Sequence, residues 1–202
     1  MAPVIVRGAL SVSKTGAVYK RQKISFPVHS REEITEAILS GITERTKIIF
    51  LSHITSSTSL RIPVEEICAI AREKGILTFI DGAHAPAQID VDLTQMACDF
   101  YTGACHKWML APKGSSFLYA QKSVQDLLDP LVVSWGYESL HPSGSQFIDY
   151  HEMQGTRDLS ALCTIPDAVK FLSENEWTQV SQECRNIVAA NADRFHDLLG
   201  AE

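Results

Sequence analysis

Ile76-Leu77-Thr78-Phe79-Ile80-Asp81-Gly82-Ala83-His84 is the most informative part of this 202-residue chain for its architecture. It begins with a short run that is apolar and rich in β-branched residues, and it then changes to a carboxylate, a glycine and a histidine. Such a run predicts a strand, and the change at its end predicts a loop at the edge of a sheet. The preceding residues, 63–75, predict a helix, because proline favours the first helical turn and glycine favours the position after the last.

The same alternation of elements extends in both directions from this stretch. Ser30-Arg31-Glu32-Glu33 is a capping box, which predicts the start of a helix. The predicted strands are residues 17–28, 47–52, 76–80, 99–103 and 115–120, and the predicted helices are residues 30–40, 63–75, 159–174 and 176–199. Residues 47–52 are continuously apolar, which predicts a strand buried on both faces. Alternating strands and helices indicate an α/β fold, a three-layer α/β/α arrangement on a mainly parallel sheet.

The composition is that of an ordinary globular protein, with 45% hydrophobic and 21% charged residues. A net charge of -6 gives no indication of a nucleic-acid or membrane partner. Residues 1–8 lack the apolar core of a signal peptide, and no apolar run approaches the ~20 residues of a membrane span. The five cysteines are widely spaced, without a Cys-x-x-Cys pair, so we expect a cytoplasmic protein with no metal site.

Polar clusters follow three of the predicted strands. Residues 52–58 follow the first of them, Asp81–His84 follow the second, and Cys105-His106-Lys107 follow the third. Ligands of open parallel sheets bind beyond the carboxyl ends of the strands, so we expect these clusters to converge on one crevice.

Asp81 and Lys107, 26 positions apart, indicate pyridoxal phosphate chemistry. A lysine amine forms a Schiff base with the aldehyde of this cofactor, and a carboxylate keeps the pyridine nitrogen protonated so that the ring accepts electrons. Taken alone, Lys107 can be a solvated surface residue and Asp81 can cap a helix. The neighbouring His106 and Trp108 favour the cofactor interpretation.

The remaining candidates have structural interpretations that stay open. His84 and His53 can be hydrogen-bonded loop histidines or site residues. The Ser/Thr run 55–59 can be turn chemistry, and residues 155–158 can be a helix cap.

Four motifs in combination resemble the class V aminotransferase family, the fold-type I enzymes that depend on pyridoxal phosphate. These motifs are Asp81–His84, Gly103–Trp108, Ala111–Gly114 and Gly155–Asp158. The branch that they resemble contains isopenicillin N epimerase-like proteins, cysteine desulfhydrases and carbon–sulfur lyases, with cysteine desulfurases more distant. The resemblance covers residues 16–199.

The resemblance implies a role for each site residue. Lys107 would carry the cofactor, and Asp81 would pair with its pyridine nitrogen. His84 would bind its phenolic oxygen, and His106 would contact its phosphate.

Further roles follow from the same resemblance. Thr55 or Ser56 would lie near the cofactor ring. Thr156 would reach the phosphate of the neighbouring subunit in a homodimer. Arg157 and His53 are candidates for binding an amino-acid substrate.

The chain also departs from the family pattern. Ala104 stands where relatives carry serine or asparagine, and Ser56 stands where they often carry asparagine. Relatives have a phosphate loop and a ring-stacking aromatic residue before the part equivalent to Gly16, and a small domain after the part equivalent to Glu202. We therefore expect a cofactor-binding core that is incomplete at both ends. Residues 1–155 would form the large-domain core, and residues 156–202 would form helices that lead toward a small domain.

The expected function is pyridoxal-phosphate-dependent chemistry at Cα or Cβ of an amino acid. Carbon–sulfur cleavage of a cysteine-like substrate is the first expectation, because the branch contains such lyases. Epimerisation and transamination are alternatives within the family. A truncated, catalytically inactive core that only dimerises is an alternative of a different class.

Overall fold

Residues 16–200 are described by a computed structural model of the chain. The expectation about a signal peptide in residues 1–8 lies outside these described residues. The chain divides into two compact units. Within the described part, the first unit comprises residues 16–84, 92–102 and 119–121, and the second comprises residues 85–91, 103–118 and 122–200.

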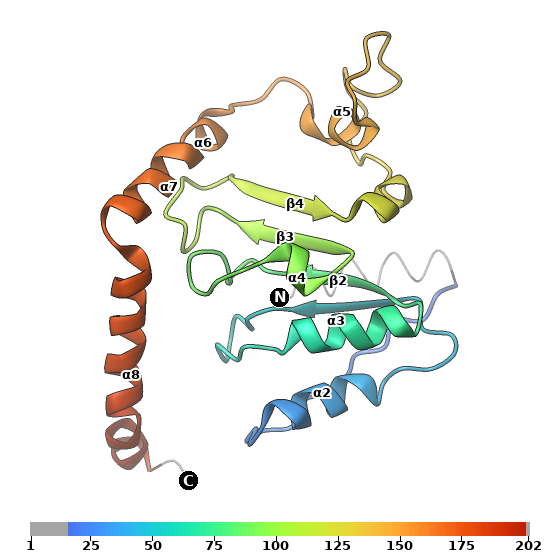
Figure 1. The fold of residues 1–202 in the computed structure, drawn as a ribbon. Helices are drawn as coiled ribbons and strands as arrows, with labels where there is room; N and C mark the ends of the chain where they lie inside the picture. The colour runs from blue at the N-terminus through green and yellow to red at the C-terminus, as the bar shows by residue number, and fades with distance from the viewer. Residues whose placement is uncertain (1–15, 201–202) are drawn as a thin grey trace. The chain divides into compact units, whose positions relative to one another are not determined.

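A four-stranded sheet has the order β1-β2-β3-β4 (Figure 1). Its strands are β1 (Ile48–Ser52), β2 (Leu77–Asp81), β3 (Phe100–Ala104) and β4 (Ser116–Ala120). β1 pairs with β2 and β2 pairs with β3, both in parallel. The aligned rings of Phe50, Phe79 and Phe100 contact one another across these strands, with centroids 5.6 Å apart in each step. The predicted α/β fold with a mainly parallel sheet is confirmed.

β4 runs antiparallel to β3, which the alternation of helices and strands does not predict. The amide of Cys105 donates to the carbonyl of Ser115 at 3.2 Å, and the amide of Gln121 donates to the carbonyl of Asp99 at 2.8 Å. These pairings run in opposite directions along the two strands. A parallel crossover needs a dozen or more residues, and the connection of residues 105–115 is shorter than that.

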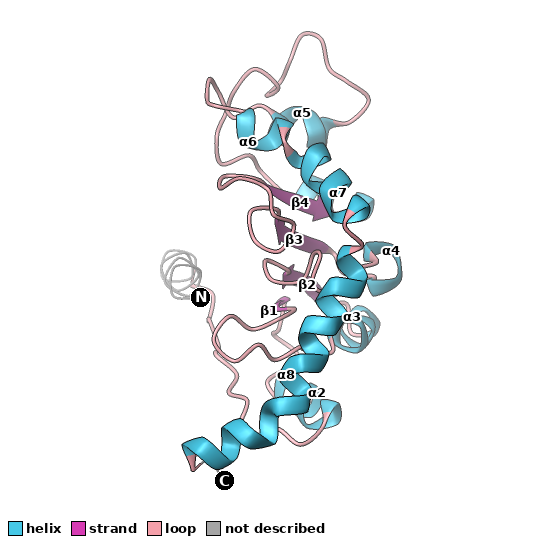
Figure 2. Cartoon of the chain, turned by 90° about the vertical axis from the view of Figure 1, so that its left-hand side faces the viewer, coloured by secondary structure: helices cyan, strands magenta, loops and turns pink. Residues whose placement is uncertain are grey.

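The helices of the first unit are α2 (Arg31–Leu39), α3 (Val64–Glu73) and the short α4 (Leu93–Met96). α3 buries Val64, Ile67, Cys68 and Ala71, whose spacing places them on one helical face. That face packs against β2, and Figure 2 shows α2, α3 and α4 on one side of the strands. The predicted capping box is confirmed, because the Ser30 hydroxyl accepts the amide of Glu33 at 3.2 Å.

Two predictions about the first unit are wrong. Residues 17–28 form no strand. The segment is extended, but its backbone does not pair with another strand, and two of its side chains bond to the C-terminal end of α2. The Lys20 amine donates to the Gly41 carbonyl, and the Gln22 amide donates to the Ser40 hydroxyl. β1 is also not buried on both faces: Ile48 is 51% exposed and Phe50 is 39% exposed. The helices of this unit cover the other face of the strands, which explains why Ile49 is buried while Ile48 and Phe50 are exposed.

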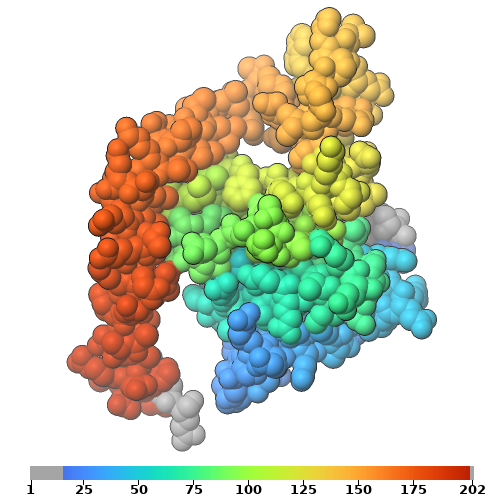
Figure 3. All heavy atoms as spheres, in the orientation of Figure 1, coloured from blue at the N-terminus to red at the C-terminus, as the bar shows by residue number. Residues whose placement is uncertain are grey.

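The second unit is largely helical. Its elements are the 3-10 helix η1 (Lys122–Leu127), α5 (Gln146–Glu152), α6 (Ser160–Cys163), α7 (Ile165–Glu174) and α8 (Trp177–Leu199). The single helix predicted for residues 159–174 is two helices, α6 and α7, with the break at Thr164. Pro166 has no amide hydrogen to continue the ladder, and it therefore begins a new helix. Figure 3 shows α6, α7 and α8 following one another, orange to red.

α8 is attached to the loop 85–91 of its own unit. The indole Nε1 of Trp177 donates to the carbonyl of Ala87 at 2.7 Å. The guanidinium of Arg185 donates to the carbonyl of Gln88 at 2.5 Å. Among the described residues, none of the helices is long and apolar enough to cross a bilayer.

Candidate active site

Asp81 is the last residue of β2 and lies at the carboxyl end of the strand. Its side chain is half-buried, and its Oδ1 accepts the amide of Ala83 at 3.0 Å. Its backbone carbonyl accepts the amide of His53 at 2.9 Å. The strand and its own turn therefore hold this carboxylate at the edge where the sequence predicts a ligand.

Gly82 fits this turn because there is no room for a side chain. Its amide donates to the carbonyl of Thr102 at 2.8 Å, which keeps the turn against β3. A Cβ at this position would lie 2.0–2.1 Å from the Cζ, Cε1 and hydroxyl of Tyr101. His84, two residues further on, is half-buried in the same unit.

His53 is fully buried directly after β1. Its Nδ1 lies 3.0 Å from the hydroxyl of Tyr101, and its Nε2 lies 4.0 Å from Oε1 of Glu65. Burial lowers the pKa of His53 to about 4, although the Glu65 carboxylate partly opposes this shift. A neutral, enclosed ring supports the structural interpretation of His53 over contact with a substrate.

Thr55 and Ser56 belong to the turn that follows His53. The Thr55 hydroxyl accepts the amide of Leu60 at 2.8 Å and lies 2.6 Å from the hydroxyl of Thr58. Ser56 is exposed. Of the two interpretations of Thr55, a turn residue or a residue near the cofactor ring, these bonds support the turn residue.

Lys107 and His106 lie in the second unit, in the turn of residues 105–109 that follows β3. Lys107 is half-buried, and its carbonyl accepts the amide of Leu110 at 3.1 Å. Nδ1 of His106 lies 2.9 Å from the carbonyl of Ser115, and a carbonyl only accepts, so Nδ1 carries a proton. This bond orients the exposed imidazole. Ala104, at the end of β3, is buried.

Thr156 and Arg157 are exposed in the second unit, just before α6. The Arg157 guanidinium donates to the side-chain carbonyl of Gln154 at 3.1 Å. Asp158 accepts the amide of Ser160 at 2.8 Å, and this bond lowers the pKa of Asp158. The N-cap of α6 is Leu159, without a side-chain cap bond, so the interpretation of Asp158 as the cap itself is wrong. Asp158 bonds the first helical amide from one position before the cap.

The structure divides the predicted site residues between the two units. His53, Thr55, Ser56, Asp81 and His84 fall in the first unit, and His106, Lys107, Thr156 and Arg157 fall in the second. The bond between the His53 amide and the Asp81 carbonyl brings the first two clusters together. Thr102, the β3 partner of Asp81, precedes Lys107 by only five positions in the chain.

Tyr101 and Glu65 are contact residues that the sequence analysis missed. Tyr101 is fully buried and bonds to His53, and a carboxylate oxygen of Glu65 is buried near the same ring. The sequence contained a signal for Tyr101, because it lies inside an apolar strand and a buried tyrosine hydroxyl usually has a hydrogen-bond partner.

Each unit offers a group of the kind that pyridoxal phosphate chemistry requires. Asp81 offers an acceptor-only carboxylate held at a strand end, and Lys107 offers a primary amine. At the phosphate end, the exposed ring of His106 has its Nδ1 occupied by Ser115, so its Nε2 would be the contact. Across residues 16–200, no group of three or more His, Cys, Asp or Glu side chains is arranged to hold a metal ion.

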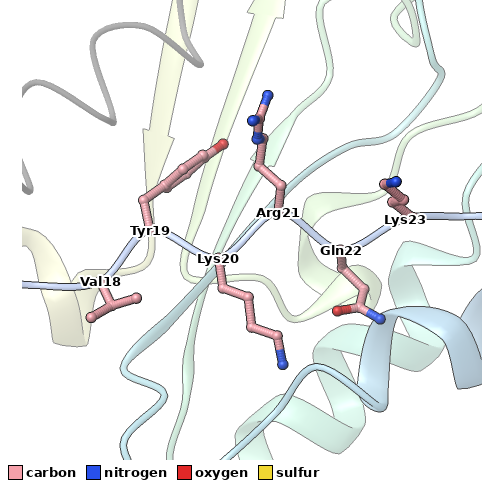
Figure 4. A pocket seen from close by; sticks show the side chains of 6 residues that line it. All are labelled: Val18, Tyr19, Lys20, Arg21, Gln22 and Lys23. Atoms are coloured by element: carbon pink, nitrogen blue, oxygen red, sulfur yellow. The ribbon is translucent and has the colours of Figure 1, made fainter.

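One cavity of about 720 Å³ lies elsewhere, along the extended segment Val18–Lys23. Figure 4 shows successive side chains of this segment pointing to alternate sides, with Tyr19 and Arg21 on one side and Lys20 and Gln22 on the other. None of the predicted site residues lines it.

Curated relatives agree with the predicted branch. The chain is 36% identical to isopenicillin N epimerase of Amycolatopsis lactamdurans, over 87% of this chain and 46% of the relative. It is 40% identical to isopenicillin N epimerase of Streptomyces clavuligerus, over 70% and 38%. It is 34% identical to a probable chloroplastic L-cysteine desulfhydrase of Arabidopsis thaliana, over 82% and 36%. The chain thus spans less than half the length of these relatives.

Solved structures show the same fold. The apo cysteine desulfurase of Thermococcus onnurineus NA1 matches with a TM-score of 0.77 at 15% identity, over 96% of this chain and 48% of that one. The cysteine desulfurase CsdA of Escherichia coli matches with a TM-score of 0.74 at 18% identity, over 96% and 47%.

A family model described as aminotransferase class-V matches residues 17–201, which is nearly the whole chain. The predicted resemblance is confirmed, and the chain belongs to the class-V aminotransferase family, whose enzymes depend on pyridoxal phosphate.

Proposed function

We propose that this chain supplies the cofactor lysine and the ring carboxylate of an enzyme that acts at Cα of an amino acid. The observation that carries the proposal is the carboxylate of Asp81, held at the carboxyl end of β2 by the amide of Ala83. Family membership supports pyridoxal phosphate as the cofactor.

When bound, the cofactor supplies an electron sink that makes the Cα proton acidic. Asp81 would hold a proton on the pyridine nitrogen, because its ionised oxygen accepts that N–H. The amine of Lys107 would anchor the aldehyde and then act as the base that removes the Cα proton. His106 would donate Nε2–H to the phosphate when its ring is protonated, because Nδ1 already donates to Ser115.

Carbon–sulfur cleavage of a cysteine-like substrate is the reaction that we propose first. It is supported by the L-cysteine desulfhydrases among the relatives, at 33–34% identity. Epimerisation is the second candidate, and it is supported by the two isopenicillin N epimerases among the relatives, at 36% and 40% identity. Both reactions begin with loss of the Cα proton. The reactions differ in the next step, which either expels sulfide or returns a proton to the opposite face.

We also propose that the enzyme is a homodimer, that Thr156 contacts the phosphate bound by the partner, and that it works in the cytoplasm. The exposed position of Thr156 before α6 is consistent with such a contact.

The test uses the purified chain with added pyridoxal phosphate, in deuterated water. L-cysteine and aliphatic L-amino acids are supplied separately. Sulfide and pyruvate from cysteine support the lyase. Deuterium at Cα, together with the D-enantiomer, supports the epimerase. If neither exchange nor product exceeds that of a Lys107→Ala control, the proposed chemistry is contradicted for this chain.

A further inference from the structure

The ring of Tyr101 lies directly beneath the turn that carries Asp81. Tyr101 is fully buried in β3, one residue before Thr102, the parallel partner of Asp81. A Cβ on Gly82 would come within 2.0–2.1 Å of the hydroxyl end of this ring. The phenol therefore occupies the space that a side chain on Gly82 would need, and the backbone of the turn rests on it.

His53 determines where that phenol lies. Its Nδ1 is 3.0 Å from the Tyr101 hydroxyl, and the two rings meet edge to face, with centroids 6.0 Å apart and an interplanar angle of 88°. His53 is itself attached to the same turn, because its amide donates to the carbonyl of Asp81. The carbonyl of His53 accepts the amide of Ile62 at 2.9 Å, which fixes the other side of the residue.

The charge around His53 favours one tautomer. Burial keeps the ring neutral, so only one nitrogen carries a proton. Oε1 of Glu65 lies 4.0 Å from Nε2, and the Arg61 guanidinium lies 3.4 Å from the same oxygen. A carboxylate attracts an N–H and repels a lone pair, so it favours the proton on Nε2. Nδ1 then accepts, and the Tyr101 hydroxyl donates to it.

We infer that Tyr101, held by His53, is a positioning residue for the Asp81–Gly82–Ala83 turn, and that it thereby sets the direction of the Asp81 carboxylate. The inference deepens the proposed function, in which this carboxylate meets the ring nitrogen of pyridoxal phosphate, and it rests on that proposal for its consequence. In this inference Tyr101 and His53 act on the turn and not on the substrate. They act through the Ala83 amide, which donates to Oδ1 of Asp81.

The first measurement needs no cofactor. Hydrogen exchange at the amides of Gly82 and Ala83 is compared in the wild-type chain, Tyr101→Phe and Tyr101→Leu. Tyr101→Leu removes the ring from beneath Gly82, so the exchange of both amides should rise about tenfold, as expected when one hydrogen bond is released locally. Tyr101→Phe keeps the ring and should show a smaller rise.

A matched control separates positioning from general stability. Ile67 lies in the buried face of α3, outside the turn, and Ile67→Val should lower the stability of the same unit. The temperature of each experiment is chosen so that the variants have the same urea midpoint. Under these conditions the Ala83 amide should exchange faster in the Tyr101 variants than in Ile67→Val. If the rise is the same in the control, Tyr101 is only a core residue and the inference is overturned.

The second measurement is a titration with pyridoxal phosphate, read by absorbance. Tyr101→Leu should raise the dissociation constant about tenfold and change the pH profile of the bound chromophore, while Tyr19→Phe, an exposed tyrosine of the same unit, should change neither. A Tyr101→Leu titration identical to wild type overturns the inference. If the wild-type chain binds no cofactor, the proposed function fails, and the exchange experiment alone decides whether Tyr101 positions the turn.

Discussion

Lys107 is the residue on which the proposed chemistry depends most. If it anchors pyridoxal phosphate, borohydride reduction followed by peptide mapping should place a pyridoxyl group on Lys107. Lys107→Ala should lower turnover by at least about 10³-fold, because both the anchor and the base are lost. The exposed Lys122 serves as the control. The Lys122→Ala variant should carry the pyridoxyl group on Lys107 and turn over substrate at the wild-type rate. A label elsewhere in protein that holds the cofactor would contradict the assignment.

Asp81 permits a sharper separation of binding from chemistry. Asp81→Asn keeps the shape and the acceptor oxygen for Ala83 but removes the charge that holds the ring proton. Cofactor affinity should fall modestly, while exchange of the Cα proton should slow by about 10²-fold or more, roughly 3 kcal/mol. Asp90→Asn, at an exposed site, is the matched control. A rate within about twofold of wild type would show that the carboxylate does not meet the ring nitrogen.

His53 should make the stability of the chain depend on pH. Its pKa is about 4 in the folded chain, against an ordinary value of 6.5, so the unfolded chain binds the proton more tightly. The stability that neutral His53 contributes is therefore complete above pH 6.5 and is lost as the pH falls toward 4. Between pH 7 and pH 5 this loss should be about 2 kcal/mol. Urea unfolding at both pH values measures this loss. Between pH 7 and pH 5 the free energy of unfolding should fall by about 2 kcal/mol more in the wild type than in His53→Asn. Equal pH dependence in the two proteins would contradict it.

At the scale of elements, the start of α2 depends on two reciprocal bonds. The Ser30 hydroxyl accepts the amide of Glu33, and the Glu33 carboxylate accepts the amide of His29 at 2.9 Å. Ser30→Ala should lower the free energy of unfolding by about 1 kcal/mol, measured by urea denaturation. Ser57→Ala, in an exposed turn, should leave it unchanged within about 0.5 kcal/mol. If the free energy of unfolding of Ser30→Ala equals that of the wild type, α2 is stabilised by packing rather than by its cap.

Elements also show where sequence reasoning succeeds. The capping box, the Pro-to-Gly helix and the short apolar strands are local patterns, and α2, α3, β1, β2, β3 and β4 lie close to their expected positions. The segment 17–28 was misjudged because its alternating side chains resemble a strand, while a strand requires a partner that sequence pattern does not supply. α5 was missed because residues 131–155 are rich in turn residues.

At the scale of the whole molecule, the chain spans less than half of its relatives' length, and several large apolar side chains are exposed. Among the described residues these include Leu131 at 97%, Trp135 at 86% and Leu198 at 81%. Ala104 offers no side-chain donor to a phosphate, and each missing charge-assisted bond costs about 1.5–3 kcal/mol. We therefore expect these 202 residues alone to bind pyridoxal phosphate weakly, with a dissociation constant above about 10 μM.

An absorbance titration of the isolated chain checks this expectation. Ala104→Ser is the informative variant, because it restores a hydroxyl where relatives are expected to carry one. It should tighten cofactor binding, whereas Ala37→Ser on α2 should not. Submicromolar binding by the unmodified chain would show that its phosphate contacts come from residues not identified above.

The family resemblance, the α/β alternation and the candidate pair Asp81 and Lys107 could all be predicted from residue type and local spacing. The antiparallel direction of β4, the burial of His53 and the position of Tyr101 beneath Gly82 became known only from the folded chain. Each of those facts is a contact between segments distant in the chain. Hydrophobic period and turn chemistry act over a few residues, whereas burial and hydrogen-bond partners are set by whichever strand or helix packs alongside.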